Sequence, residues 1–432
     1  SGVVASVASH VYNSIIADVR DKEYFEKAGY KMKYDATRKT TVDAWREFRN
    51  KCSKRALVIM PVQTGELREF AIKNNLFVLN LNKELGDAGA GQNISLLEEV
   101  LAWLEPNAPV YGWEQGVSED QFVARVSKSG HPMIPCDWSY NHSLLSLLYE
   151  KGREQVLPRI FDPRSIDFKK KKNFVSFFLS DGDNIQWMMQ DFASRYYDVP
   201  EAEDVKMTFG LPVATLAMMA PVQFNNLMGL QKQNCSLMEM LGGGYYYVDT
   251  YSQDHNRKTN LRVAAKRLSV SICQYQIKLL GIMAMDVKSE AAKEAYQVYV
   301  DANDQLEGIV VLQYSPYAGG EGEVFWVTNK AGYDIPVITV KYSLWDRIHE
   351  REGSPDFIAS KLKEEAQEES FSVVCVHAWS RFEGDTYGAS AAKRCAERLD
   401  DRFEAINMQE LVWRLRMSRR PEQTLDYLNK IY

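Results

Sequence analysis

The sequence predicts an α/β protein in which a smaller N-terminal α/β domain precedes a (β/α) barrel, distorted and seven-stranded. Apolar runs of strand length alternate with amphipathic segments of helical period along the chain. The segment "VLPRIFDPRSIDFKKKK", residues 156–172, interrupts this alternation with two prolines and ends in four lysines. Such a charged, proline-containing stretch is typical of a solvated connector, so we expect the domain boundary near residue 165.

Composition excludes several classes of protein. The 432 residues are 45% hydrophobic, and the formal net charge is −6, so the chain has no basic field for nucleic acid. The longest apolar stretch, "GLPVATLAMMAPV", is too short to span a bilayer, so no membrane span is predicted. The start, "SGVVASVASH", lacks the features of a signal peptide, so we expect any export signal to have been removed or never to have existed. Six widely spaced cysteines without a C-x-x-C pair are expected to be buried thiols.

Residues 1–165 contain four short runs typical of strands, "ALVIMP", "LFVLNL", "PVYGW" and "HPMIPC". The clearest helical segment among them is "NISLLEEVLAWLE". This alternation predicts a small open α/β domain. No glycine-rich phosphate loop follows any of these runs, so neither a nucleotide site nor a cofactor is predicted.

Residues 166–432 repeat the alternation on a larger scale. Seven strand-like runs are "FVSFFLS", "KMTFGLPV", "LLGIMAM", "GIVVLQY", "PVITVKY", "SVVCVHA" and "FEAINM". Amphipathic segments such as "SEAAKEAYQVYVDAN" and "SPDFIASKLKEEAQEE" separate them. Near-continuous apolar strands between helices indicate a parallel sheet covered on both faces, most economically a (β/α) barrel. An open doubly wound sheet is the alternative.

Polar and aromatic side chains follow almost every predicted strand. The first strand runs into "SDGDNIQW", residues 180–187, which contains two carboxylates, two amides and an indole. Parallel strands end at one edge of a sheet, where α/β enzymes place their sites. We therefore expect Asp183, Asp286 and His377 at the same rim.

A carbohydrate fits these residue types. Between the second and third strands, Gly242 to Gly244 in "GGGYYYVDTY" allow an unusual backbone path. A cleft of carboxylates, amides and aromatic rings can bind the hydroxyls of a sugar and pack against its C–H faces. The predicted substrate-binding residues are Asn184, Gln186, Trp187, Tyr245, Tyr247, Asp286, Tyr314, His377 and Trp379.

Each feature also has a simpler structural interpretation. Asp181 and Asp183 suit an Asx turn that caps a helix. At least one of three consecutive tyrosines must face the core, and His377 in an apolar strand could be a hydrogen-bonded core histidine. The coincidence of polar and aromatic residues at several independent strand ends favours a site.

Several of these segments resemble the GxGYxYP putative glycoside hydrolase family of Bacteroidetes and related bacteria. "GGGYYYV" resembles its signature motif, with Val248 in place of the motif's proline. "SDGDNIQW", "VHAWS" and "LVWRLRMSRRPEQT" look like other segments of the family, and "VYGW" and "PCDWSYNHS" look like its N-terminal domain. The resemblance implies a carbohydrate substrate and an exported, periplasmic or extracellular protein of a glycan-degrading bacterium.

Glycoside hydrolysis usually requires two carboxyl groups that flank the scissile bond, one as general acid and one as nucleophile or base. Asp181 and Asp183 are close in sequence, so we expect one, Asp183, to catalyse while the other orients it. Asp249 is the predicted opposing carboxyl, with Glu321 as the alternative because its glycine-rich surroundings suggest a mobile loop. His377 could polarise a carboxylate or bind a hydroxyl.

Two other functions stay open. A metal-dependent polysaccharide deacetylase commonly uses two histidines spaced i, i+4, and none of the six histidines here has that spacing. "DGDN" could begin a calcium loop, but the later ligands of such a loop are missing, so no metal is assigned. The other alternative is a carbohydrate-binding protein without turnover. The sugar, the linkage, the stereochemistry and the oligomeric state are not predicted.

Overall fold

The computed structural model describes residues 2–60, 65–81, 93–113, 118–136, 139–149, 155–180, 184–253, 255–348 and 352–432. The chain forms two compact units. The N-terminal unit comprises Ser1–Tyr149, Gly244–Tyr246 and Tyr251–Asn260, and the C-terminal unit comprises Glu150–Gly243, Tyr247–Thr250 and Leu261–Tyr432. The first segment of the N-terminal unit therefore ends at Tyr149. The domain boundary expected near residue 165 stays a prediction.

The N-terminal unit contains a parallel four-stranded sheet with the order β2-β1-β3-β4. Its strands are β1 (Ser53–Ile59), β2 (Leu76–Leu79), β3 (Val110–Gly112) and β4 (Met133–Pro135). These strands coincide with the four apolar runs of the sequence. The unit therefore contains a parallel sheet built from the expected strands.

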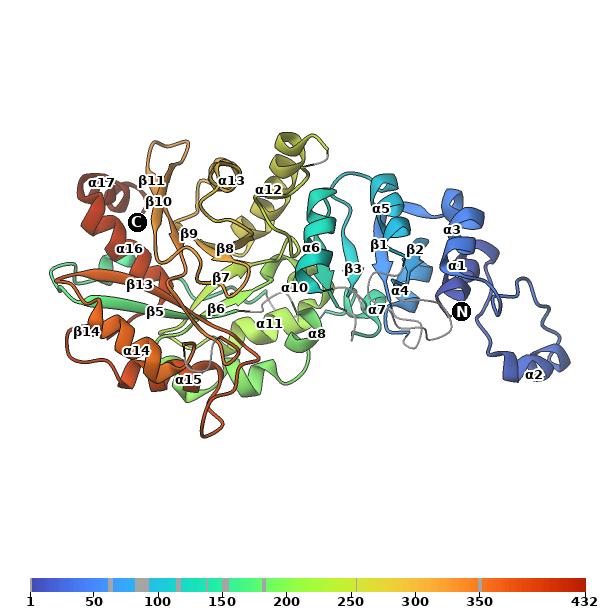
Figure 1. The fold of residues 1–432 in the computed structure, drawn as a ribbon, viewed down its shortest axis with the longest axis horizontal. Coiled ribbons are helices and arrows are strands. Elements are labelled where there is room, and N and C mark those ends of the chain that lie inside the picture. Colours follow the sequence, from blue (N-terminus) through green and yellow to red (C-terminus); the bar gives the residue numbers. More distant parts are fainter. Residues whose placement is uncertain are drawn as a thin grey trace. The chain divides into compact units, whose positions relative to one another are not determined.

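The helices of this unit are short, and Figure 1 shows them beside the sheet in blue and cyan. They are α1 (Gly2–Tyr12), α2 (Lys22–Lys27), α3 (Thr41–Phe48), α4 (Arg68–Lys73), α5 (Ile94–Trp103), α6 (Glu119–Lys128) and α7 (His142–Leu145). Helix α3 begins with a capping box between Thr40 and Asp43. It buries Trp45, whose ring centroid lies 5.0 Å from that of Phe77 on β2.

The C-terminal unit contains a larger, mainly parallel sheet. Its order is β10-β11-β9-β8-β7-β6-β5-β13-β12, and β14 also pairs with β5. The strands are β5 (Asn173–Leu179), β6 (Thr208–Leu211), β7 (Ser236–Met240), β8 (Leu279–Ala284), β9 (Gly308–Gln313), β10 (Val324–Thr328), β11 (Asp334–Thr339), β12 (Tyr342–Leu344), β13 (Ser370–Val376) and β14 (Phe403–Ala405). Only the β10–β11 pairing is antiparallel among those described.

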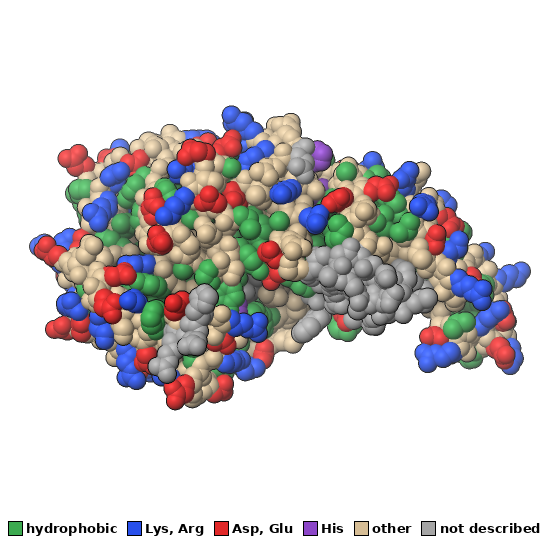
Figure 2. Space-filling model, viewed as in Figure 1, with side chains coloured by type: hydrophobic (Ala, Val, Ile, Leu, Met, Phe, Trp, Pro, Cys, Tyr) green, Lys and Arg blue, Asp and Glu red, His purple; other side chains and the backbone are tan. Residues whose placement is uncertain are grey.

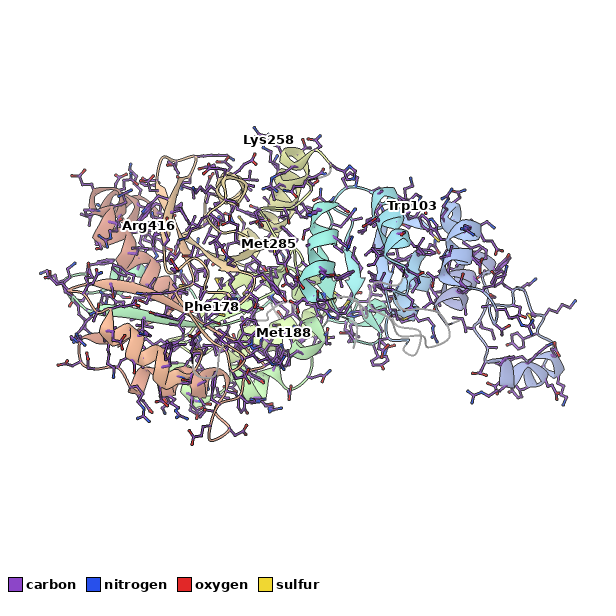
Figure 3. All side chains as sticks on the ribbon, viewed as in Figure 1. Trp103, Phe178, Met188, Lys258, Met285 and Arg416 are labelled. Atoms are coloured by element: carbon purple, nitrogen blue, oxygen red, sulfur yellow. The ribbon has the colours of Figure 1, made fainter. Side chains whose placement is uncertain are left out.

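Helices connect these strands and cover the sheet (Figure 1). They are α8 (Ile185–Met188), α9 (Pro200–Asp204), α10 (Val213–Met219), α11 (Pro221–Leu230), α12 (Arg257–Gln274), α13 (Glu290–Ala302), α14 (Pro355–Glu364), α15 (Gly388–Glu397), α16 (Met408–Arg419) and α17 (Pro421–Ile431). Strand β5 is buried along its whole length, as its apolar sequence predicts for a sheet covered on both faces; Phe178 is labelled in Figure 3. The mixed α/β fold class is confirmed.

One continuous segment, residues 334–344, contributes both β11 and β12. Along it, Thr339 N donates to Glu323 O at 3.0 Å, and Val340 N donates to Val311 O of β9 at 3.2 Å. Lys341 N then donates to Val373 O of β13 at 2.9 Å. The segment is therefore hydrogen-bonded to β9 along its first part and to β13 along its last.

The surface carries charges of both signs, and four of the six cysteines are buried as expected. Figure 2 shows acidic and basic side chains interspersed on the face that it draws. None of the described helices is both long enough and apolar enough to cross a membrane. All six cysteines are free thiols; four are buried, whereas Cys52 and Cys273 are half-buried.

Candidate functional site

The parallel strands of the C-terminal unit bring their carboxyl ends to one edge of the sheet. Val376 of β13 pairs with Leu179 of β5, which pairs in turn with Phe209 of β6. Strands β8 and β9 end together at Ala284 and Gln313. The predicted residues Asn184, Asp286, Tyr314, His377 and Trp379 all follow ends of this kind. Asp181 and Asp183 lie outside the described residues.

Two tryptophans lie together after β5 and β13. Trp187 is buried, whereas Trp379 is 46% exposed, and their ring centroids are 4.7 Å apart. The Trp187 ring also packs edge-on against Phe192 and Tyr196, each at 4.8 Å. Trp379 is therefore an exposed aromatic surface held by a buried aromatic group.

Arg381, which the sequence analysis did not predict as a site residue, packs against the aromatic rings near Trp187. The Arg381 guanidinium lies 3.6 Å from the ring centroid of Tyr387 and donates to Tyr196 Oη at 3.1 Å. Arg381 follows Trp379 by two residues in the loop after β13. Its role in packing the rings depends on tertiary contacts with residues near 196 and 387, and no local sequence pattern indicates those contacts.

His377 is held by a stacked ring and by a chain of hydrogen bonds. Its ring lies parallel to that of Trp345, with 4.3 Å between centroids and 8° between planes. Its Nδ1 lies 3.0 Å from Ser380 Oγ, and that hydroxyl donates to Asp346 Oδ1 at 3.2 Å. Asp346 also accepts from Arg381 N at 3.1 Å. Sequence reasoning missed Asp346, which follows β12 in a turn without any pattern of its own.

This chain of hydrogen bonds fixes the orientation of the imidazole. Ser380 Oγ lies beside His377 Nδ1, donates to Asp346 Oδ1 and accepts from Asp346 N at 3.1 Å. Ser380 is fully buried, so it orients the histidine and is not placed as a nucleophile. His377 is thus arranged as a positioned proton acceptor or hydrogen-bond partner.

Asn184 and Gln186 lie close together at the start of α8. Gln186 is buried, and its Nε2 donates to Asn184 Oδ1 at 3.3 Å. The two amides therefore support one another beside Trp187. Their predicted contact with substrate stays a prediction.

Asp249 has a structural environment. Its side chain is 5% exposed, and its two carboxylate oxygens accept from Met285 N at 3.0 Å and Asp286 N at 2.9 Å. Met285, labelled in Figure 3, directly follows β8. Asp249 thus fixes the backbone at the end of β8, and each of its carboxylate oxygens accepts a hydrogen bond from a backbone amide.

The carboxylates after β8 and β9 are more exposed. Asp286 Oδ1 accepts from Lys288 N at 2.9 Å, which makes a local turn before α13. Lys288 Nζ lies 3.1 Å from Glu323 and 3.7 Å from Glu321. The Glu321 side chain is 81% exposed, so its carboxylate is open to solvent and to a ligand.

The tyrosines of "GGGYYYV" are core residues. Tyr245 belongs to the N-terminal unit, where its backbone pairs with Met133 and its hydroxyl donates to Glu119 at 2.8 Å. Tyr247 belongs to the C-terminal unit and is fully buried, 5.6 Å from the ring of Tyr314. Both aromatic rings therefore stabilise the fold. Substrate contact by Tyr245 and Tyr247 stays a prediction.

The glycines of the same motif make room for neighbours. A Cβ on Gly242 would lie 1.9 Å from Glu239 Oε1, and a Cβ on Gly244 would lie 2.4 Å from that of Pro132. Gly244 also has a φ of +107°. At Gly243 the nearest atom would be 3.8 Å away. The structure thus requires glycine at the first and third positions of the motif and tolerates a side chain at the second.

Glu239 is a buried carboxyl that sequence reasoning missed. It lies on β7, is fully buried, and accepts from Ala214 N at 2.8 Å. Burial raises its pKa to about 8, although hydrogen bonds from backbone amides act in the opposite direction. A glutamate inside the apolar run "SLMEM" is the signal that could have found it.

The structure offers no metal centre among the residues that it describes, because nowhere there do three or more His, Cys, Asp or Glu side chains gather closely enough to hold an ion.

Comparisons with known proteins identify the family to which the chain belongs. Residues 171–416 match the model of the GxGYxYP putative glycoside hydrolase C-terminal domain, and residues 54–147 match the GxGYxYP third domain. The first match alone spans more than half of the chain. The chain belongs to the GxGYxYP putative glycoside hydrolase family, as the sequence resemblance indicated.

A solved structure has the same fold. It is described as a putative hydrolase from Bacteroides thetaiotaomicron VPI-5482, and it superposes with a TM-score of 0.80 at 18% sequence identity. The similarity covers 97% of this chain and 77% of that chain. At this identity the likeness shows the fold alone. No curated protein matches the chain.

Proposed function

We propose that the protein is a glycoside hydrolase that binds an oligosaccharide or polysaccharide at the carboxyl edge of the C-terminal sheet. The observation that carries the proposal is the pairing of exposed Trp379 with buried Trp187, close in sequence to the positioned ring of His377. Aromatic rings bind the C–H faces of sugars, and a positioned imidazole can exchange a proton with a hydroxyl or a carboxyl group. Family membership supports this class of substrate.

We assign Asp183 as the catalytic carboxyl and Asp181 as its orienting partner, on the sequence pattern alone. For the second carboxyl, the structure favours Glu321 over Asp249. The Glu321 side chain is open to solvent, whereas both oxygens of Asp249 already accept hydrogen bonds from the backbone. A catalytic carboxyl must have an oxygen available to the glycosidic bond or to water.

The architecture in this proposal is a closed ring of seven strands: β5, β6, β7, β8, β9, the segment 334–344, and β13. The support is the hydrogen bonding of that segment, which reaches β9 from Val340 and β13 from Lys341. A ring of this kind would direct all the strand ends into one rim, where barrel enzymes carry their active sites.

The second candidate function is carbohydrate binding without turnover. This candidate is favoured by the hydrogen bonding of Asp249 and Asp286, two predicted rim residues. Both carboxylates accept hydrogen bonds from backbone amides, which is a structural role and not a catalytic one. We retain export to the periplasm or the cell exterior as part of the proposal, from family resemblance.

The test is incubation of the purified chain with a panel of bacterial, plant and host glycans, with chromatography of the released sugars. The proposal expects release of product from at least one glycan, and loss of release when His377 is replaced by Gln. Binding of a glycan by the same preparation without any release would favour the second candidate.

A further inference from the structure

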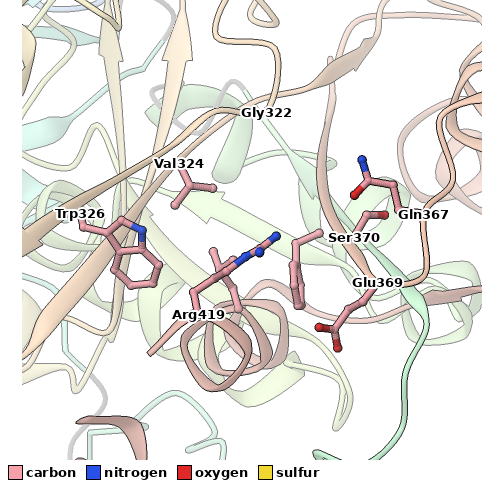
Figure 4. Close-up of a pocket in the computed structure, with 9 residues that line it drawn as sticks. Gly322, Val324, Trp326, Gln367, Glu369, Ser370 and Arg419 are labelled. Carbon is pink, nitrogen blue, oxygen red and sulfur yellow. The ribbon is translucent and has the colours of Figure 1, made fainter. Parts of the chain in front are cut away.

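A cavity of about 290 Å³ lies within the C-terminal unit, between β10, the start of β13 and α16 (Figure 4). It is lined by Gly322, Val324, Trp326, Gln367, Glu369, Ser370, Phe371, Leu415 and Arg419. Strands β10 and β13 both pair with the same edge of segment 334–344, since Thr339 N bonds to Glu323 and Lys341 N bonds to Val373. The cavity occupies the place where these two strands separate.

The apolar walls of the cavity are held by their own neighbours. The ring of Trp326 lies 4.7 Å from the Arg420 guanidinium, and Arg420 pairs with Asp334 at 3.0 Å. The ring of Phe371 stacks on Phe174 with 5.9 Å between centroids. Two aromatic rings in fixed positions therefore form part of the lining, which suits a ligand with an apolar face.

The charge of the cavity comes from Arg419. Figure 4 shows its guanidinium extending into the space between Trp326 and Glu369. Among the residues that the structure describes, the Arg419 side chain has no ion-pair or hydrogen-bond partner. Its neighbour Arg414, in contrast, is paired with Glu410 at 2.8 Å.

The one carboxylate in the lining is already neutralised. Glu369 pairs with Lys171 at 2.9 Å and accepts from Ser418 Oγ at 2.7 Å. The unpaired positive charge of Arg419 therefore remains as the net charge of the cavity. The Arg419 side chain is exposed to solvent, and its planar donors match the two oxygens of a carboxylate.

Gln367 adds neutral polar groups. Its backbone is fixed by Asn173, which donates to Gln367 O at 3.0 Å and accepts from Gln367 N at 3.1 Å. Within the described part of the chain its side-chain amide has no hydrogen-bond partner. Gln367 is exposed, and its side-chain amide can donate to and accept from hydroxyl groups on a ligand.

We propose that this cavity is a binding site for one acidic sugar unit, a hexuronic acid, whose carboxylate pairs with Arg419 and whose ring lies against Trp326 and Phe371. The volume is at the lower end of ordinary ligand pockets, which suits a single ring. The carboxylate is inferred from Arg419, whereas the choice of a sugar as its carrier rests on the proposed function.

The cavity is separate from the catalytic rim. Its lining includes Ser370 and Phe371, the first residues of β13, whereas His377 follows the last residue of that strand. At the rise of a β-strand these positions are roughly 20 Å apart. The site would therefore recognise an acidic unit of the glycan, or a released acidic sugar, at a distance from the reacting bond.

The test is calorimetric titration of the full chain with D-glucuronate, D-glucose and benzoate. Arg419→Gln removes the charge, Val324→Phe fills the cavity without a change of charge, and Arg38→Gln, at an exposed position of the N-terminal unit, is the matched control. Circular dichroism verifies that each variant is folded. Loss of one charge-assisted pair should weaken binding about tenfold to a hundredfold.

The proposal expects saturable glucuronate binding by wild type and Arg38→Gln, at least tenfold weaker binding by the other two variants, and little binding of glucose. It is overturned by no glucuronate binding, by equal binding to Arg419→Gln, or by binding of benzoate alone. Hydrolysis is measured separately on the glycan panel. A chain that binds glucuronate but hydrolyses nothing would contradict the proposed function and leave this site standing.

Discussion

The rings of His377 and Trp345 lie nearly parallel, 4.3 Å between centroids and 8° between planes, at the ends of the neighbouring strands β13 and β12. Ser380 and Asp346 hold the imidazole from its Nδ1 side. The histidine is thus fixed in position and in orientation, which a group that exchanges a proton with a ligand requires.

Replacement of His377 by Gln is expected to lower kcat/KM by about 10²-fold on any glycan that the wild type hydrolyses, because an amide cannot exchange a proton. The thermal midpoint should change little, since the glutamine occupies the same half-buried place. His255→Gln, an exposed histidine of the N-terminal unit, is the control. Equal activity of His377→Gln and wild type would rule out a role in proton transfer.

Trp379→Ala is expected to weaken glycan affinity about threefold to tenfold, because one aromatic contact contributes about 0.5–1.5 kcal/mol. Its exposure of 46% means that folding should be affected little. Calorimetry and thermal melts separate the two effects. Tyr149→Ala removes an aromatic ring that is 79% exposed and serves as the control. An unchanged affinity would show that Trp379 does not contact sugar.

The three glycines of the motif should respond differently to alanine. Gly242→Ala and Gly244→Ala place a Cβ 1.9 Å and 2.4 Å from their nearest atoms, so each should lower the free energy of unfolding by about 1–3 kcal/mol. Gly243→Ala meets nothing closer than 3.8 Å and should be tolerated. Urea denaturation measures all three. A Gly243→Ala variant as unstable as the other two would contradict this account of the motif.

Glu239 should make the protein less stable as the pH rises. Its pKa in the folded chain is about 8, above the ordinary value of 4.5, so between these values the folded state binds more protons than the unfolded state. The contribution of this group is therefore fully present below about pH 4.5 and is lost as the pH rises through about 8.

The measurement is the urea midpoint at pH 6 and pH 9 for wild type, Glu239→Gln and the control Glu23→Gln, an exposed glutamate of α2. Glu239→Gln should show a smaller fall in midpoint between the two pH values than wild type, because glutamine does not ionise. Glu23→Gln should follow wild type. An identical fall in all three chains would show that Glu239 does not titrate in this range.

The sequence was sufficient to predict most of the C-terminal sheet. Apolar runs located β5, β6, β8, β9, β11 and β13, because strands buried on both faces have few polar residues. The run "FEAINM" also located β14, although its residues are only half-buried. Strand β7 was missed because Glu239 interrupts its run, and β10 was missed because it is an antiparallel edge strand with mostly half-buried residues. That β12 continues β11 depends on the partners of Val340 and Lys341, which no local pattern indicates.

The sequence predicted which types of residue lie at the candidate site, but it did not predict the structural role of each residue. The sequence placed His377 and Trp379 after one strand, and the structure shows what holds them there, including Asp346 and Arg381. Asp249 was expected as a catalytic carboxyl, and its hydrogen bonds to two backbone amides could not be foreseen, because they join segments 36 residues apart. Pairings over such distances in the chain arise from tertiary packing.

The most direct test of a glycoside hydrolase is the turnover of Asp183→Asn on whichever glycan the panel identifies. The near-isosteric amide can neither ionise nor deliver a proton, so turnover should fall about 10²-fold or more while folding, measured by circular dichroism, is retained. Asp181→Asn should lose less, and Asp204→Asn, whose carboxylate forms a surface pair with Lys393, should match wild type. Turnover by Asp183→Asn equal to that of wild type would contradict the assignment of this carboxyl and, with it, the proposed mechanism.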